Sequence, residues 1–212
     1  MQLIGHRGSR ACLPENTVEA ALYSIKHGAT CIEIDLDMCA TGEIVVTHDH
    51  HTRWKAFKDS GPSVVRLRTF LSKIPGHVAV YLDVKNYQVV DRLEAELTGF
   101  GNRDLWFASF DPISVEKAKE KVPCISRFGI ICSVLPNNWG NTDIDFYSVD
   151  VSFGCGYVGE IAEVMARNKQ VYYWTVNHPK ELEGLPIPTG IVTDDPFLFK
   201  GWDKLFSHDN TQ

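Results

Sequence analysis

Short runs rich in β-branched and aromatic residues alternate with helix-like segments along almost the whole of this 212-residue chain. Nine strand-like runs can be distinguished, and they are 2–8, 31–37, 43–49, 78–85, 104–110, 124–131, 145–151, 170–176 and 190–196. Helix-like stretches lie between several of them, near residues 16–28, 66–73, 87–98, 112–121 and 157–168. Because strands that alternate with helices usually form a parallel sheet covered by helices, the pattern predicts an α/β fold.

One pair of strand-like runs breaks this alternation. The link between them, residues 38–42, is too short for a crossover helix, so the second and third runs should form an antiparallel hairpin arm. Eight runs remain, which predicts a (β/α)8 TIM barrel with a short hairpin arm after the second strand. The alternative is an open doubly wound sheet, but no GxGxxG or GxxxxGK loop supports it. We expect one domain over residues 1–200 and a polar tail over 201–212.

The helix expected over residues 16–28 carries its own boundary signals. Asn16 is a favoured N-cap residue, and Glu19 follows three positions later, as in a capping box. Gly28 is placed to end the helix. The sequence therefore predicts that Asn16 caps this helix.

Charge and hydropathy exclude several classes of partner. The net charge of −6 at pH 7 is not that of a protein with a broad basic face, so we expect no nucleic-acid partner. No run of 18 apolar residues occurs, so we expect no stable membrane insertion. The first motif begins at Gly5, which leaves no room for a signal peptide and favours a cytoplasmic location. No pattern indicates the oligomeric state.

The six cysteines are spread along the chain and form no CxxC pair. Their spacing supports neither a structural zinc site nor a disulfide framework. Most of them are expected to be small, buried, apolar residues.

Polar residues gather where the predicted strands end. Active residues of a TIM barrel lie at the carboxyl ends of its strands, so these positions are the candidates for a functional site. Alternate residues of a strand share a face, so polar residues two apart point the same way, roughly 7 Å apart along the chain. The candidates are His6, Arg7, Glu33, Asp35, His48, Asp83 and Lys85.

The three carboxylates among them predict a metal site. Glu33 and Asp35 alternate with apolar residues on a strand whose two faces should both be covered, and Asp83 ends the next long strand. A buried carboxylate needs a partner, and an oxygen-rich site suits one divalent cation, Mg²⁺ or Ca²⁺. Zinc would prefer histidine or cysteine, and only the run at 48–51 keeps that option open.

The remaining strand-end residues favour phosphate chemistry. Arg7 and Lys85 are fixed cations that, together with a metal, would bind a phosphate strongly. His6 and His48 could serve as base and acid on opposite sides of it. The combination predicts cleavage of a phosphodiester.

Eight motifs occur in the order found in one enzyme family. They are GHRG, LPENT, IEIDLD, VVTHD, LDVK, SF, WTVN and IVTDDP, and they extend from residue 4 to about residue 197. In these motifs the chain resembles the glycerophosphodiester phosphodiesterases. The resemblance implies a barrel fold and metal-dependent hydrolysis of a small glycerophosphodiester to glycerol 3-phosphate and an alcohol.

The resemblance also implies roles for individual residues. His6 and His48 match the acid–base pair of the family, and Glu33, Asp35 and Asp83 match its metal ligands. Its phosphate-contacting and pocket-lining residues are matched by Arg7, Lys85, Phe110, Trp174 and Asn177. Glu15, within LPENT, is a further candidate to approach the site.

Two departures from the family pattern keep a second substrate class open. Asp83 stands where the family usually has glutamate, and the segment between His48 and Asp83 is short, which implies a reduced insertion over the pocket. A more open pocket would admit a larger head group or a lipid. The alternative is lysophospholipase D or sphingomyelinase D-like cleavage on the same barrel, with a cyclic phosphate product.

Two other classes agree less well with the residues. A barrel that binds a phosphorylated ligand without turnover would be expected to lack a histidine or a metal ligand, and none is missing. A zinc hydrolase built on the run 47–52 would need its HxH motif at the end of the first strand instead.

Overall fold

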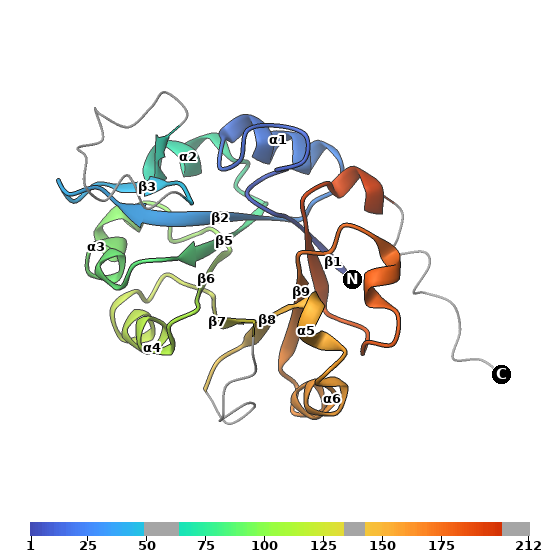
Figure 1. Ribbon diagram of the computed structural model, residues 1–212. Helices are drawn as coiled ribbons and strands as arrows, with labels where there is room; N and C mark the ends of the chain where they lie inside the picture. Colours follow the sequence, from blue (N-terminus) through green and yellow to red (C-terminus); the bar gives the residue numbers. More distant parts are fainter. Residues whose placement is uncertain (49–63, 134–142, 201–212) are drawn as a thin grey trace.

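A closed barrel of parallel strands forms the centre of the computed structural model, which describes residues 1–48, 64–133 and 143–200. Within these residues the strands run in the order β1-β10-β9-β8-β7-β6-β5-β2, and pairing of β1 with β2 closes the ring (Figure 1). The strands are β1 (Gln2–Gly5), β2 (Cys31–Met38), β5 (Ala79–Val84), β6 (Leu105–Ser109), β7 (Arg127–Cys132), β8 (Phe146–Asp150), β9 (Gln170–Trp174) and β10 (Gly190–Thr193). The predicted (β/α)8 TIM barrel is confirmed.

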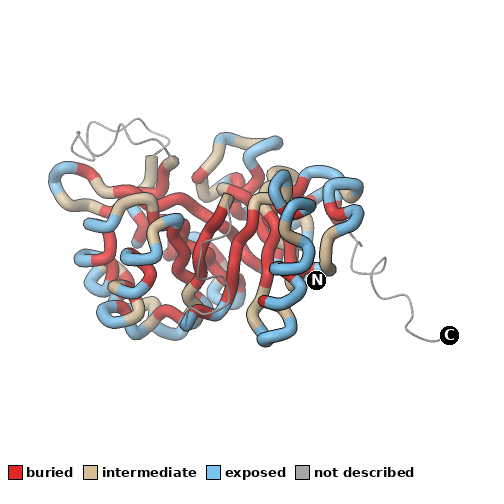
Figure 2. The backbone as a smooth tube through the Cα atoms, turned by 60° about the horizontal axis from the view of Figure 1, so that its bottom comes forward, coloured by how far each residue is buried: buried red, intermediate tan, exposed pale blue. Residues whose placement is uncertain are grey.

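Helices surround this barrel, and their outer faces are exposed while the strands are buried (Figure 2). They are α1 (Val18–Lys26), α2 (Leu67–Lys73), α3 (Tyr87–Leu97), α4 (Pro112–Lys121), α5 (Val151–Gly154) and α6 (Val158–Ala166), with 3₁₀ turns η3 (Pro179–Leu182) and η4 (Pro196–Phe199). No helix in the described part of the chain is long and apolar enough to cross a membrane.

The expected hairpin arm is present. Strand β3 (Ile44–Val46) pairs antiparallel with the end of β2, with Leu36 opposite Val46, and β4 (Val65–Arg66) pairs antiparallel with β3. Because β3 runs back along β2, it returns the chain to the carboxyl end of the barrel. Most of the segment expected as a reduced insertion, 49–63, lies outside the described residues, as does the tail 201–212.

Large aromatic side chains fill the interior of the barrel. Tyr81, Trp106, Phe146 and Tyr172 are fully buried, and their rings meet at centroid separations of 5.5–6.3 Å. Gly129 on β7 leaves room for them, because a Cβ atom there would lie 2.3 Å from the Phe146 ring. The barrel is therefore a packed core up to the level at which its polar residues begin.

A second apolar layer lies between strands and helices. On β2, Ile32, Ile34 and Leu36 belong to this outer layer, whereas Cys31 belongs to the inner one. Because successive side chains of a strand alternate, the residues between these three apolar positions point toward the barrel axis. This alternation directs Glu33 and Asp35 inward, as the sequence predicted.

The predicted cap of the first helix is wrong. Helix α1 begins at Val18, and its N-cap is Thr17, whose side-chain oxygen accepts a hydrogen bond from the Ala20 N–H at 3.2 Å. Asn16 has a φ of 60° and is buried, and its side chain bonds to Asp35 instead. Both residues are good capping types, and only the fold decides between them.

The expectation for the cysteines is correct only in part. Cys31, Cys39 and Cys132 are buried, whereas Cys12 and Cys155 are exposed, and all six thiols are free. The exposed pair lies in connections between elements, where hydrophobic periodicity gives no signal of burial.

Replacing Thr17 by alanine tests the corrected cap. Loss of the hydroxyl leaves the Ala20 N–H without its acceptor, so the free energy of unfolding should fall by about 1 kcal/mol in urea denaturation. Thr17→Ser keeps the hydroxyl and is the matched control. Equal stability of the alanine variant and the wild type would show that Thr17 does not cap α1.

Candidate active site

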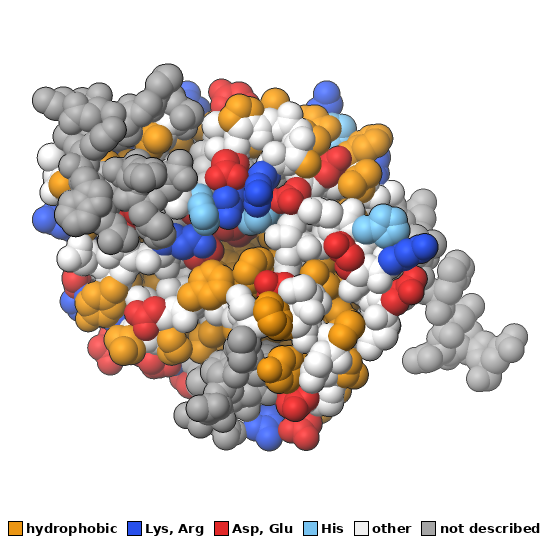
Figure 3. Space-filling model, viewed as in Figure 1, with side chains coloured by type: hydrophobic (Ala, Val, Ile, Leu, Met, Phe, Trp, Pro, Cys, Tyr) orange, Lys and Arg blue, Asp and Glu red, His pale blue; other side chains and the backbone are white. Residues whose placement is uncertain are grey.

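A pocket opens at the carboxyl end of the barrel, and strand-end residues line it. Figure 3 looks onto this end, where acidic, basic and histidine side chains gather on one side and hydrophobic side chains on the other. The lining residues are His6, Arg7, Glu33, His48, Tyr81, Asp83, Lys85, Phe110, Ile131, Ser148, Trp174 and Val192. Most of the predicted site residues therefore meet in one place.

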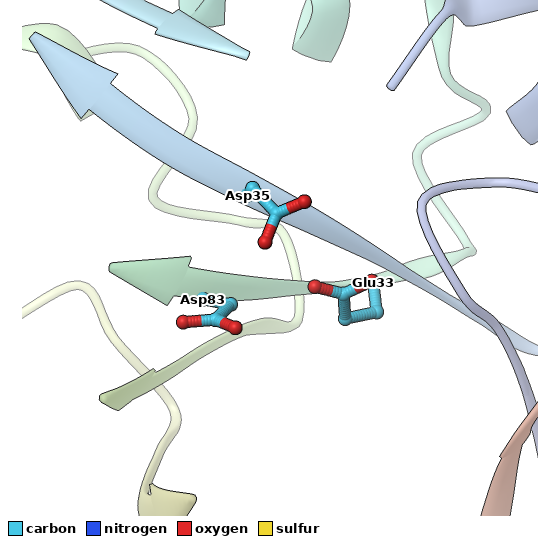
Figure 4. A group of neighbouring side chains, drawn as sticks. All are labelled: Glu33, Asp35 and Asp83. Carbon is cyan, nitrogen blue, oxygen red and sulfur yellow. The ribbon is translucent and has the colours of Figure 1, made fainter. Parts of the chain in front are cut away.

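The three predicted metal ligands lie close together; Glu33 and Asp83 line the pocket, whereas Asp35 is not among its lining residues. Asp35 on β2 is paired in register with Asp83 on β5. Glu33 precedes Asp35 by two residues on β2, so the two side chains share a face of the strand. One ligand atom from each carboxylate lies within 4.8 Å of the others, and all three residues are at least 94% buried. Figure 4 shows the three carboxylates directed toward one another.

Two residues of the β1–α1 loop hold these carboxylates in place. Asn16 donates from Nδ2 to Asp35 Oδ2 at 2.9 Å, and its Oδ1 accepts from the Asp35 N–H at 3.1 Å. The Arg7 N–H donates to Glu33 Oε2 at 2.7 Å, from a backbone with a φ of 49°. A non-glycine residue in this left-handed region is uncommon and often marks a functional site.

Two cations partly neutralise the cluster. The Arg7 guanidinium lies 3.0 Å from Asp35 Oδ2 through Nε and donates from Nη1 to Glu15 Oε1 at 2.9 Å. Lys85 Nζ lies 3.0 Å from Asp35 Oδ1 and also donates to Asp83 Oδ2. Glu15 therefore approaches the site through Arg7, as the sequence suggested.

The environment shifts the pKa values of the three carboxylates in different directions, upward for Glu33 and Asp83 and downward for Asp35. Burial raises the pKa of Glu33 well above its ordinary value, and the neighbouring Asp35 and Asp83 charges raise it further. Burial also raises the pKa of Asp83 to about 6, although Lys85 opposes the shift. For Asp35 burial acts in the same direction, but Lys85 and Arg7 outweigh it and lower its pKa. A cation that entered the cluster would displace protons from Glu33 and Asp83.

The donor set fits a hard divalent cation. All three ligand groups are carboxylates, and no histidine or cysteine of the described residues joins their cluster. Asp83 Oδ1 is buried and accepts no hydrogen bond within the described residues. A buried carboxylate oxygen without a donor is costly, and Mg²⁺ or Ca²⁺ would remove that cost. Glu33, Asp35 and Asp83 are the residues that would hold the ion.

The two histidines reach the pocket from different elements. His6 follows β1, and its Nδ1 lies 2.6 Å from Asp194 Oδ1. His48 follows β3 in the hairpin arm. Burial lowers the pKa of His48, and the positive charges of Arg7 and Lys85 add to this effect.

Aromatic side chains form the apolar wall of the pocket. Phe110 and Trp174 meet edge to face with ring centroids 5.7 Å apart, and Phe110 is 47% exposed. Lys85 Nζ lies 5.4 Å from the Phe110 centroid. The Trp174 indole N–H donates to the Ser148 carbonyl at 3.0 Å, which fixes the plane of its ring.

Asn177 is not among the lining residues, although the resemblance suggested that it would be. Its side chain contacts Asp194, which in turn contacts His6. Sequence reasoning missed Asp194 and the bond from Asn16 to Asp35. The motif IVTDDP contains two adjacent aspartates, Asp194 and Asp195, and the sequence alone does not show which of them contacts His6. In the structure Asp194 does so, whereas Asp195 caps η4.

The fold and this pocket define a (β/α)8-barrel enzyme whose site combines carboxylates, cations and histidines. The sequence model of the Glycerophosphoryl diester phosphodiesterase family matches residues 6–60. YhdW of Bacillus subtilis, whose own assignment as a glycerophosphodiester phosphodiesterase is provisional, is 23% identical over 243 residues, covering 94% of this chain and 97% of YhdW. The uncharacterized B. subtilis protein YqiK is 35% identical over 89 residues, which is 40% of this chain and 35% of YqiK.

Solved structures share the fold over nearly the whole chain. A phosphodiesterase from Oleispira antarctica, in complex with the product sn-glycerol-3-phosphate, has a TM-score of 0.86 at 19% identity and covers 96% of this chain and 97% of its own. A glycerophosphodiester phosphodiesterase from Thermotoga maritima has a TM-score of 0.76 at 21% identity, with the same two coverages. The match of residues 6–60 to the family model and the shared barrel agree with the resemblance seen in the motifs.

The pKa of Asp83 predicts a pH-dependent response to Mg²⁺ or Ca²⁺. Its pKa is about 6 in the fold against an ordinary value of 3.8, so the metal-free fold retains a proton that the unfolded chain releases. Metal-free stability should therefore fall as pH rises from about 4 to about 6, and stabilisation by the cation should grow over the same interval. Thermal unfolding with EDTA or with saturating Ca²⁺, at several pH values, measures both trends.

Two variants control this experiment. Asp83→Asn should greatly weaken the stabilisation, which is about 2.7 kcal/mol in the wild type at a concentration of 100 times Kd. Asp91→Asn, which alters an exposed ion pair with Lys117, should leave it intact. An equal response in the two variants, or one independent of pH, would contradict the assignment.

Proposed function

We propose that this protein hydrolyses glycerophosphodiesters to glycerol 3-phosphate and an alcohol, with one divalent cation and histidine acid–base catalysis. The observation that carries the proposal is a cluster of three buried carboxylates, two of which line one pocket together with two cations and two histidines. The family model that matches residues 6–60 supports the same reaction. The product bound to the Oleispira antarctica neighbour is sn-glycerol-3-phosphate, which this pocket would release.

Binding of the substrate phosphate falls to the cations. Arg7 and Lys85 line the pocket beside the carboxylates, and their N–H groups are donors that a phosphate oxygen could accept from. A divalent cation held by Glu33, Asp35 and Asp83 would polarise the phosphoryl oxygens and offset the charge that develops on them. Phe110 and Trp174 would cover the apolar part of the substrate.

Proton transfer falls to His6 and His48. One takes the proton of the attacking hydroxyl as its oxygen bonds to phosphorus, and the other gives a proton to the leaving alcohol as the P–O bond breaks. The attacking hydroxyl is either that of water or that of the substrate's own glycerol. In the second case a cyclic phosphate forms first, and water then opens it.

The shorter ligand Asp83 is compatible with this reaction. Asp83 is paired with Asp35 in the β2–β5 register and belongs to the carboxylate cluster, and its Oδ1 accepts no hydrogen bond within the described residues. Lysophospholipase D or sphingomyelinase D-like cleavage is the second candidate, because Phe110 is half exposed at the mouth, where an acyl chain could lie. The product separates the two reactions, since the second would stop at a cyclic phosphate. The cytoplasmic location and the absence of a nucleic-acid partner stay predictions.

Replacing either histidine by alanine tests the catalytic assignment. Removal of the base or the acid should lower kcat by about 10²–10⁴-fold, because each general acid–base contribution has this size. Release of glycerol 3-phosphate from glycerophosphocholine in the presence of Mg²⁺ or Ca²⁺ is the measurement.

His77 provides the matched control for these variants. It is an exposed histidine just before β5, at the opposite end of the barrel from the pocket. His77→Ala should retain wild-type turnover. Near-wild-type activity of His6→Ala or His48→Ala would remove that residue from the catalytic pair.

A further inference from the structure

We infer that Asp194 is a positioning residue that fixes the ring of His6, and that Asn177 acts through Asp194 and not on the substrate. The inference rests on the proposed function, because it describes how that site is prepared for proton transfer. The contacts that carry it link the ends of β1, β9 and β10, which are neighbours in the barrel.

The contact between His6 and Asp194 determines which ring nitrogen faces the pocket. Nδ1 of His6 lies 2.6 Å from Asp194 Oδ1, and the two side chains are only 10% and 18% exposed. Burial opposes ionisation of Asp194, but hydrogen bonds from His6 and Asn177 outweigh it and lower its pKa. An ionised carboxylate only accepts hydrogen bonds, so Nδ1 carries the proton and Nε2 is left to exchange protons in the pocket.

Asn177 holds Asp194 through both ends of its amide. Its Nδ2 donates to Asp194 Oδ2 at 2.8 Å, and its Oδ1 accepts from the Asp194 N–H at 2.9 Å. The same Oδ1 also accepts from the Thr193 hydroxyl at 3.2 Å. These backbone and hydroxyl donors fix the amide orientation, so Nδ2 must face the side chain of residue 194.

Few hydrogen-bonding positions of Asn177 remain for a substrate. Three of its side-chain hydrogen-bonding positions are used by Asp194 and Thr193 within the described residues, which leaves one amide hydrogen. The backbone N–H of Asn177 donates to Glu181 Oε2 at 2.7 Å, which also holds the residue in place. These hydrogen bonds suit Asn177 to holding the Asp194 carboxylate in place better than to contacting a ligand directly.

Hydrogen bonds also hold the backbone of Asp194 in place. Its carbonyl accepts from the Ala11 N–H at 3.1 Å and from the Ser9 hydroxyl at 3.2 Å. His6 is held from the same strand, because its N–H donates to the Thr193 carbonyl at 2.8 Å. The carboxylate and the imidazole are therefore fixed relative to each other by several bonds besides their own.

This arrangement makes Asp194→Asn a specific perturbation. In that variant the Asn177 Nδ2 amide group still needs an acceptor, so the new amide presents its oxygen to Asn177 and its NH₂ to His6. An NH₂ group donates, so Nδ1 of His6 must accept and the proton moves to Nε2. The substitution reverses the tautomer with almost no change in shape, whereas a purely structural role would leave the tautomer unchanged.

Nitrogen NMR of ¹⁵N-histidine-labelled full-length protein measures the tautomer directly, without turnover. In wild-type protein the neutral form of His6 should carry its proton on Nδ1, and in Asp194→Asn on Nε2. A proton on Nε2 of wild-type His6 would overturn the inference, whatever the activity. A correct tautomer in a protein that does not cleave glycerophosphodiesters would contradict the proposed function and leave the positioning role standing.

Kinetics test the role of Asn177. Asp194→Asn should lower kcat by about 10²–10⁴-fold, with KM changed by less than about threefold. Asn177→Ala should lower kcat less, and the double variant should be no slower than Asp194→Asn alone, because residues that act as one unit are not additive. Asp195→Asn, at the neighbouring N-cap of η4, should retain wild-type kcat. A raised KM with unchanged kcat in Asn177→Ala, additive with Asp194→Asn, would instead make Asn177 a substrate ligand.

Discussion

The balance of charge around three buried carboxylates is the constraint on which the rest of this site depends. Each buried, ionised carboxylate costs several kcal/mol unless cations or hydrogen-bond donors surround it. Here Arg7 and Lys85 supply two charges, and Asn16 and the Arg7 N–H supply directed donors. One negative charge remains in excess when all three are ionised, and Asp83 Oδ1 accepts no hydrogen bond within the described residues, so a bound cation would complete the balance.

The barrel makes this concentration of charge possible. Parallel strands bring all their carboxyl ends to one edge, and a packed aromatic core fills the barrel beneath the pocket. Low polarity strengthens each remaining electrostatic contact, which is useful when charge develops on a phosphate during its cleavage. The same strand ends position the histidine that would transfer protons, through the contacts of His6 with Asp194.

Much of this arrangement could be predicted from sequence because it follows from strand periodicity. Inward-facing Glu33 and Asp35 and the short hairpin link are local features that a period of two residues reveals. The cap of α1 could not be predicted, because Asn16 and Thr17 are adjacent capping types and the choice depends on a bond to distant Asp35. The contact between His6 and Asp194 joins residues 188 positions apart, and only closure of the barrel brings them together.

The most direct test of the central claim is a phosphorus NMR time course with metal-stripped protein and glycerophosphocholine. EDTA should give no reaction, and addition of Mg²⁺ or Ca²⁺ should give a growing glycerol 3-phosphate signal. A signal that stops at the cyclic phosphate would favour the lipid-directed reaction. Equal turnover in EDTA and in metal, or no turnover with either ion, would contradict a metal-dependent glycerophosphodiesterase built on Glu33, Asp35 and Asp83.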